Sequence, residues 1–380
     1  MAPVSEPQIR AVLATVNDPE IKRPITELGM VDHVTVEGQR VGVRILLTVS
    51  GCPMKETLTR EVTAAVLRLD SSLDVTVDLG VMTDDQRKGL QDVLRGGRTE
   101  REIPFAKAGS LTKVYAIASG KGGVGKSSVT VNLALAMAAH GLKVGVLDAD
   151  VYGHSVPDML GIGDARPTQV EDMILPVPVK GMKVMSVGML KPRKDQVVAW
   201  RGPMLDRALV QMLSDVYWGD LDTLLVDLPP GTGDVAISLG QHLPNAEVVV
   251  VTTPQPAAAS VAERAGTMAS MMHQRVVGVI ENMSYLELPA TGERMEIFGS
   301  GGAEQVAATL STRFGYDVPV LGQVPLDQRL RIGGDDGLPI VEAAPETTAA
   351  RVLTDIATRL GGRSRGLAGM QLGLAPAGRL

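Results

Sequence analysis

Residues 120–127 read GKGGVGKS, and this octapeptide constrains the fold of the chain more than any other segment. It fits the pattern G-x-x-x-x-G-K-[ST], which carries a mechanism only where a strand precedes it and a helix follows. Both flanks are present, because 113–118 (KVYAIA) is typical of a buried strand and 127–139 (SSVTVNLALAMAA) of a helix. Glycines let backbone N–H groups curl around phosphate oxygens, and a helix N-terminus adds a positive dipole end. The segment therefore predicts a site for nucleotide phosphates.

Each residue of this loop is a candidate for nucleotide contact. Lys126 is expected to reach the β- and γ-phosphates, and Ser127 is expected to ligate Mg²⁺. Lys121 is a second lysine, which an ordinary loop of this kind does not require. The predicted nucleotide-binding residues are Gly120, Lys121, Gly122, Gly123, Val124, Gly125, Lys126, Ser127 and Ser128.

The chain from 113 to about 360 alternates short apolar runs with longer segments of helical spacing. That alternation is typical of a parallel sheet with crossover helices, so we expect an α/β domain. The expected strands are 114–118, 144–147, 184–187, 223–226, 248–252, 276–280 and 318–320. The predicted division is a small α+β domain at 1–95, a polar linker at 96–112, the α/β domain at 113–360 and a disordered tail at 361–380.

Aspartates follow two of the expected strands. Asp148 and Asp150 come after 144–147, and Asp227 follows 223–226. Because open parallel sheets bind ligands outside the carboxyl ends of their strands, all three should lie near the phosphate loop. We expect Asp227 to hold Mg²⁺ through water, Asp150 to orient an attacking water, and Asp148 to support the metal indirectly. A lone aspartate at a strand end is more often a helix cap, but two such ends beside the loop favour the metal and water roles.

Composition excludes several classes of protein. The 37 basic and 43 acidic residues give a net charge of −6, and aromatic residues make up 3%, so we expect no nucleic-acid partner. No run approaches the roughly 18 apolar residues of a membrane span, and no apolar signal core is seen, so we expect a cytoplasmic protein without a membrane partner. The single cysteine, Cys52, rules out a disulfide or an all-cysteine metal site within one chain.

Several segments together resemble one family. They are 119–128 (SGKGGVGKSS), 148–157 (DADVYGHSVP), 200–204 (WRGPM), 227–234 (DLPPGTGD), 252–255 (TTPQ), 280–285 (IENMSY) and 297–302 (IFGSGG). In combination they resemble the Mrp/ApbC family of ATP-dependent iron–sulfur cluster carriers. The segments 18–31 and 48–54 resemble the small iron–sulfur-assembly domain that is often fused to that ATPase.

The resemblance implies a P-loop NTPase fold with the deviant Walker A loop of the MinD/ParA class, preceded by the small α+β domain. It implies ATP and Mg²⁺ as cofactors, ATP hydrolysis, and transfer of iron–sulfur clusters to apoproteins. It also implies a homodimer in which Lys121 reaches the partner's phosphates, so that Lys121, Lys126 and Asp150 are the catalytic residues. Asn282, whose amide offers both a donor and an acceptor, becomes an adenine contact.

One part of the family pattern is missing. Family members usually carry a Cys-x-x-Cys pair after the ENMSY segment, and two such pairs supply the thiolates of a bridging cluster, which requires about four. Leu288 and Thr291 stand where the cysteines would align. Cys52 is either a contact for the cluster or for a partner's thiol, or a small buried apolar residue.

The missing pair leaves two functions open. The first is an ATPase that carries clusters. The second is a nucleotide-switched adaptor that holds no cluster and recruits other iron–sulfur assembly proteins. A positioning ATPase like MinD or ParA is disfavoured, because the tail is too glycine-rich for a membrane-binding helix and the net charge indicates no DNA-binding face.

Overall fold

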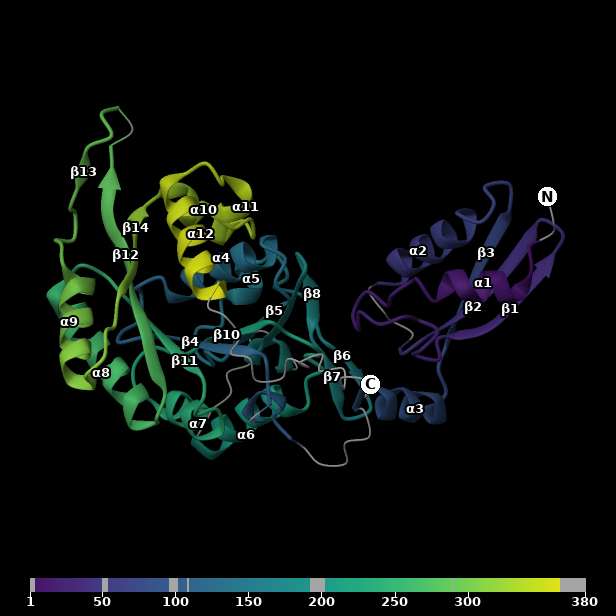
Figure 1. The fold of residues 1–380 in the computed structure, drawn as a ribbon, viewed down its shortest axis with the longest axis horizontal. Helices are drawn as coiled ribbons and strands as arrows, with labels where there is room; N and C mark the ends of the chain where they lie inside the picture. Colours follow the sequence, from purple (N-terminus) through teal and green to yellow (C-terminus); the bar gives the residue numbers. More distant parts are fainter. Residues whose placement is uncertain are drawn as a thin grey trace, which may run out of the picture. The chain divides into compact units, whose positions relative to one another are not determined.

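The computed structural model describes residues 4–49, 54–95, 102–107, 109–191, 202–288 and 290–362 (Figure 1). Within these ranges the chain forms two compact units. The first contains residues 1–102, 166–178 and 214–219, and the second contains 103–165, 179–213 and the chain from 220 onward. The first unit is therefore made of three chain segments, whereas the sequence predicted one continuous domain over 1–95. The predicted tail lies outside the described residues, apart from its first two positions.

The first unit is built on a three-stranded sheet in the order β1-β2-β3. β1 and β2 are antiparallel, and β2 and β3 are parallel and joined by a crossover helix. Its main elements are α1 (Glu6–Leu13), β1 (Val31–Glu37), β2 (Arg40–Leu47), α2 (Lys55–Leu67), β3 (Asp74–Val81) and α3 (Asp84–Arg95). This arrangement agrees with the expected small α+β fold.

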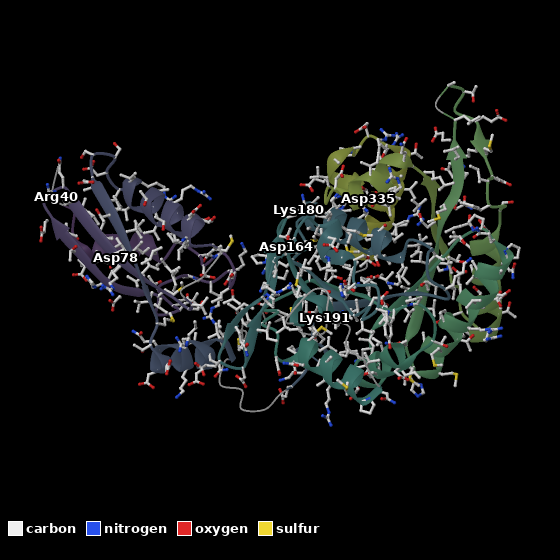
Figure 2. All side chains as sticks on the ribbon, turned by 180° about the vertical axis from the view of Figure 1, so that it is seen from behind. Arg40, Asp78, Asp164, Lys180, Lys191 and Asp335 are labelled. Carbon is white, nitrogen blue, oxygen red and sulfur yellow. The ribbon has the colours of Figure 1, made fainter. Side chains whose placement is uncertain are left out.

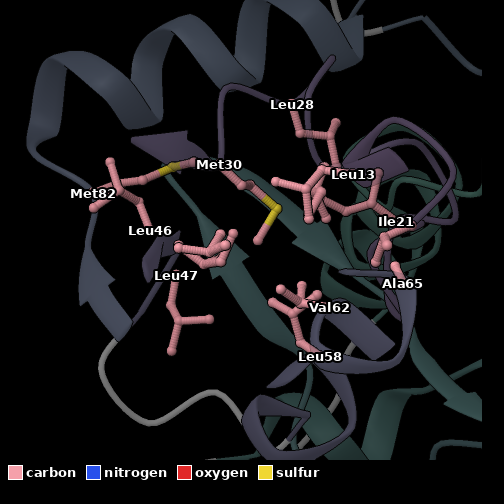
Figure 3. Packing of buried hydrophobic residues seen from close by; sticks show 14 of the residues in the cluster. Leu13, Ile21, Leu28, Met30, Leu46, Leu47, Leu58, Val62, Ala65 and Met82 are labelled. Atoms are coloured by element: carbon pink, nitrogen blue, oxygen red, sulfur yellow. The ribbon is translucent and has the colours of Figure 1, made fainter. Parts of the chain in front are cut away.

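A hairpin from later in the sequence completes the core of this unit. The hairpin consists of β6 (Thr168–Val170) and β7 (Met173–Leu175), which pair antiparallel. Val170, Met173 and Leu175 are buried in the same cluster as Leu13, Met30, Leu46, Leu58, Val62 and Met82. Figure 3 shows how the side chains of the N-terminal segment converge in this cluster. Polar contacts reinforce the attachment, because Gln91 hydrogen-bonds Asp172 and Arg87 pairs with Glu171.

The second unit contains a sheet in the order β13-β12-β11-β4-β10-β5-β9-β8, with β14 paired to β12. β4, β5, β9, β10, β11, β12 and β14 pair in parallel, and β12 and β13 pair antiparallel. The strands are β4 (Lys113–Ser119), β5 (Val144–Asp148), β8 (Val177–Val179), β9 (Met182–Ser186), β10 (Thr223–Asp227), β11 (Glu247–Thr252), β12 (Arg275–Glu287), β13 (Arg294–Met295) and β14 (Val320–Leu326). The predicted parallel α/β sheet is thus confirmed, although β14 begins only where the predicted run 318–320 ends, and β8 and β13 were not expected.

Helices cover both faces of this sheet (Figure 1). They are α4 (Lys126–Ala139), α5 (Val156–Met159), α6 (Gly202–Ser214), α7 (Asp234–His242), α8 (Pro256–Met271), α9 (Gly302–Phe314), α10 (Gln328–Asp335), α11 (Ile340–Ala343) and α12 (Thr348–Gly361), with short 3₁₀ turns at Pro104–Ala106 and Val187–Leu190. Because the central strand β4 is covered on both sides, its residues from Val114 to Ser119 are all buried. No helix in the described ranges is both long and apolar enough to cross a membrane.

Two carboxyl groups are buried in the first unit. Burial raises the pKa of Glu20 to about 7, and the nearby Asp18 carboxyl adds to the shift. Burial also raises the pKa of Asp18. Glu20 Oε1 accepts a hydrogen bond of 3.1 Å from Thr168 Oγ1 on β6, which partly offsets the burial. The charged form of Glu20 is therefore disfavoured in the folded unit.

We predict that the free energy of unfolding of the first unit falls as the pH rises from about 4.5 through 7. In this interval the folded state binds a proton at Glu20 that the unfolded state has released, so the loss reaches up to about 3 kcal/mol. Glu20→Gln keeps an acceptor for Thr168 and should remove most of this slope. Urea unfolding of the full chain, followed by the fluorescence of buried Trp218 in a Trp200→Phe background, measures it. Glu56→Gln, at an exposed site on α2, is the control, and an equal slope in both variants would contradict the prediction.

Candidate nucleotide site

The loop between β4 and α4 borders a cavity of about 240 Å³. The cavity is lined by residues 121–128 with Ser119, Asp150, Gly153, Ser155, Met159 and Pro230. Every predicted contact within the loop except Gly120 therefore lines it. A Cβ on Gly120 would clash with the backbone of Val261 and Ala262, so this glycine allows α8 to approach the loop closely.

Gly125 closes the loop at the N-terminus of α4. It has a φ of +77°, in the left-handed region, and a Cβ there would collide with the amide of Asn282. Asn282 Nδ2 donates a hydrogen bond of 2.9 Å to the carbonyl of Val124. Because β12 carries Asn282, this bond ties the phosphate loop to the carboxyl half of β12.

The other amide atom of Asn282, Oδ1, is buried and has no hydrogen-bond partner in the described structure. The bond to a carbonyl oxygen identifies the atom facing Val124 as the nitrogen, so the unpartnered atom is an acceptor. Buried acceptors are normally satisfied. The adenine contact expected for Asn282 stays a prediction, and this acceptor is available for it.

Asp227, at the end of β10, is the centre of the polar contacts below the loop. Asp227 pairs in register with Ile117 on β4 and with Asp148 on β5. Because the phosphate loop follows β4, this register places Asp227 beside the loop. Lys126 Nζ lies 2.7 Å from Asp227 Oδ1, and Ser127 Oγ donates to Oδ2 at 2.5 Å. The two side chains of the ion pair are 6% and 0% exposed. The structure thus brings together three residues that the sequence assigned to phosphate and Mg²⁺.

Thr130, which was not predicted as a site residue from the sequence, also contacts Asp227. Its hydroxyl lies 2.9 Å from Asp227 Oδ1 and 3.0 Å from the carbonyl oxygen of Lys126. The signal was present in the spacing, since a residue four positions after Lys126 lies on the same face of the helix.

Asp148 lies behind the cavity and is not part of its lining. It is fully buried, and burial together with the charge of Asp227 raises the pKa of Asp148 to about 8. Its oxygens accept hydrogen bonds from the backbone N–H groups of Asp150 and Val156 and from the Ser186 hydroxyl. These bonds fix the segment after β5, and the indirect support of Mg²⁺ expected from Asp148 stays a prediction.

Asp150 faces the cavity from that same segment. Its Oδ1 accepts hydrogen bonds from the backbone N–H groups of Tyr152 and Gly153, at 3.2 and 3.0 Å. Four residues after Asp150, His154 Nε2 lies 3.0 Å from Nζ of Lys191, which Figure 2 labels. These contacts, together with the bond from the Asp150 N–H group to Asp148, hold the segment around Asp150, and they position its carboxylate at the cavity.

The site of the missing cysteine pair lies in the turn between β12 and β13. Leu288 N–H donates to the carbonyl of Glu293, and Thr291 N–H donates to the carbonyl of Leu288, so the turn is closed by its own backbone. Within the described residues, no three or more His, Cys, Asp and Glu side chains are grouped to hold a metal ion. Cys52 lies outside the described residues.

Comparisons with known proteins agree over nearly the whole chain. A family model described as NUBPL iron-transfer P-loop NTPase matches residues 110–361, and one described as iron-sulfur cluster assembly protein matches residues 6–79. A protein from Mycobacterium tuberculosis named iron-sulfur cluster carrier protein is 57% identical, covering 98% of this chain and 97% of the relative. A protein of the same name from Deinococcus radiodurans is 42% identical, covering 92% and 93%.

A solved structure is also similar to the second unit. It is a nucleotide-binding protein from Archaeoglobus fulgidus in complex with ADP, with 36% identity and a TM-score of 0.53. The match covers 63% of this chain and 92% of that chain.

We predict that Gly125→Ala destabilises the protein without nucleotide by roughly 3 kcal/mol, because left-handed strain adds to the clash with Asn282. Gly123→Ala is the matched control. Its φ is +80°, but a Cβ would have open space, so strain alone costs about 1 kcal/mol. Urea unfolding compares the two.

The double variant Gly125→Ala/Asn282→Ala tests the cause. It should cost less than the sum of its single variants, because Asn282→Ala removes the atoms that collide. Strict additivity, or equal costs for Gly123→Ala and Gly125→Ala, would contradict the assigned contact.

Proposed function

The chain belongs to the family of NUBPL iron-transfer P-loop NTPases, and from this we propose that it binds and hydrolyses ATP with Mg²⁺ and uses that cycle to carry iron–sulfur clusters to apoproteins. The observation that carries the proposal is the convergence of Lys126, Ser127 and Asp227 beside a cavity that Asp150 also lines. This set contains the charges and oxygen ligands that phosphoryl transfer requires.

Lys126 and Ser127 would bind the phosphates and the metal. Lys126 exchanges its ion pair with Asp227 for phosphate oxygens, and the N–H groups of the loop surround the same oxygens. The hydroxyl of Ser127 and the carboxylate of Asp227 fit Mg²⁺, which prefers oxygen ligands. Bound Mg²⁺ neutralises charge that develops on the phosphates. Asn282 Oδ1 supports adenine as the base, because it can accept from the exocyclic amino group that guanine lacks at this position.

Asp150 and Lys121 would act in hydrolysis. The Asp150 carboxylate, fixed by the N–H groups of Tyr152 and Gly153, orients the attacking water. Lys121 is exposed at the cavity wall, so in a homodimer its ammonium group is free to reach the phosphates of the partner subunit. Each site is then completed by a lysine from the other chain.

A mixing experiment tests this assignment. Lys121→Ala and Asp150→Ala chains should each lose ATP turnover, while Asp150→Ala retains nucleotide binding. Co-refolded in equal amounts, they should recover about a quarter of the wild-type rate, because half of the dimers are mixed and each has one intact site. Phosphate release measures the rate. An inactive mixture would contradict a role for Lys121 across the interface, and Lys121→Ala mixed with itself is the control.

The cluster is the cargo of the proposed cycle. The chain supplies few of the thiolate ligands that such a cluster requires. Leu288 and Thr291 provide no thiolate, and Cys52 gives one thiol per chain. A bound cluster therefore needs exogenous thiols or ligands from the client protein to reach about four. The absence of the Cys-x-x-Cys pair is the specific observation that favours the second candidate, a nucleotide-switched adaptor that recruits other assembly proteins.

Anaerobic reconstitution separates the two candidates. A carrier should take up iron and sulfide and absorb near roughly 400 nm, as thiolate-bound clusters do, and Cys52→Ser should lose this signal. Leu288→Cys/Thr291→Cys restores the family spacing and should bind a cluster more stably than the natural chain. Uptake by the double-cysteine variant with none by the natural chain would reject the carrier and support the adaptor. The paired variant Leu288→Ser/Thr291→Ser controls for changes in the turn.

A further inference from the structure

Three side chains contact the carboxylate of Asp227: Lys126, Ser127 and Thr130. In the proposed function, nucleotide binding affects these three contacts differently. Lys126 and Ser127 line the cavity, and in the proposed function both turn to phosphate and Mg²⁺. Thr130 is fully buried and does not belong to the cavity lining. Its contact with Asp227 Oδ1, at 2.9 Å, is therefore the one of the three that a bound nucleotide leaves in place.

We propose that Thr130 is a positioning residue that anchors Oδ1 of Asp227 and so directs Oδ2 toward Ser127 and the metal. The assignment rests on the proposed function, since it concerns the same Mg²⁺ site. A carboxylate can rotate about its Cβ–Cγ bond when Lys126 leaves it. A hydroxyl on a buried, helical residue stops that rotation, because β-branched side chains in helices have few rotamers.

The geometry also contains a purely structural alternative. Thr130 Oγ1 lies 3.0 Å from the carbonyl oxygen of Lys126, which is the common bond from a helical threonine to the residue four positions before it. A hydroxyl has one proton, and both neighbouring groups are acceptors, so one proton cannot serve both at once. If the bond to the carbonyl dominates, Thr130 stabilises α4 and has no effect on the metal.

The dependence of ADP binding on Mg²⁺ distinguishes these roles. Isothermal titration with ADP is run on the full chain in excess Mg²⁺ and in EDTA. Thr130→Val keeps the branched shape and removes the hydroxyl. It should lower ADP affinity about ten-fold in Mg²⁺, the size expected for one charge-assisted hydrogen bond, and change it less than about two-fold in EDTA. Thr130→Ser should restore the Mg²⁺ effect.

A matched control is Thr354→Val on α12. The hydroxyl of Thr354 donates to the carbonyl of Ala350, four positions earlier, with no carboxylate involved. This variant should leave both affinities unchanged. If Thr130→Val does not fold, Thr130→Ala takes its place in the same titrations.

An unchanged Mg²⁺ effect in Thr130→Val, or an equal loss with and without Mg²⁺, would overturn the positioning role while leaving the nucleotide site intact. If the natural chain itself binds ADP without any Mg²⁺ effect, the proposed function fails at its metal site, and the role of Thr130 fails with it.

Discussion

The buried ion pair between Lys126 and Asp227 is the interaction on which the nucleotide site depends. Removing one partner of such a pair typically costs about 3–5 kcal/mol, because the other charge is left without compensation in a region shielded from water. Asp227 lies between β4 and β5 and is fully buried, so its carboxylate depends on Lys126 for compensation of its charge. Any ligand that draws Lys126 away must itself bring a cation or retain the hydroxyl contacts of Asp227. In the proposed function, the binding of phosphate and the binding of Mg²⁺ are therefore coupled, because the metal would compensate the charge of Asp227 when Lys126 turns to phosphate.

The positions of the candidate site residues could be predicted from the sequence where the pattern is local. The loop at 120–127 was predictable because strand, glycines and helix are contiguous, and Asp148, Asp150 and Asp227 were predictable because strand ends gather at one edge of a parallel sheet. Thr130 was not predicted, although its helical spacing of four positions from Lys126 places the two residues on the same face of α4. The hairpin β6–β7 was not predicted either, because strands of three residues give no periodic signal and the core that the hairpin packs against is formed by residues far away in the sequence. Such long-range packing depends on the fit between two surfaces, and no single short stretch of the sequence contains both of them.

The contact between Asn282 and the phosphate loop bears on the choice between carrier and adaptor. β12 continues from Asn282 into the turn that holds Leu288, where the guanidinium of Arg294 lies 4.3 Å from the ring centroid of Tyr285. One strand thus connects the loop to the turn where the family pattern described above expects the Cys-x-x-Cys pair. In the proposed function, β12 is therefore the element that would connect a change in the loop to that turn, whether or not the turn holds a cluster. The proposed nucleotide cycle is therefore compatible with either function.

The three-segment construction of the first unit has a consequence for biosynthesis. Val170, Met173 and Leu175 belong to its hydrophobic core, so the core is incomplete until the ribosome has passed these residues. Domains usually fold as units, from the N-terminus onward, as the chain emerges. In this unit, the core lacks the side chains of β6 and β7 while β4, α4 and β5 are being made. The core of this unit is therefore completed only after part of the second unit has been synthesised, and the apolar surface that packs against β6 and β7 stays uncovered until then.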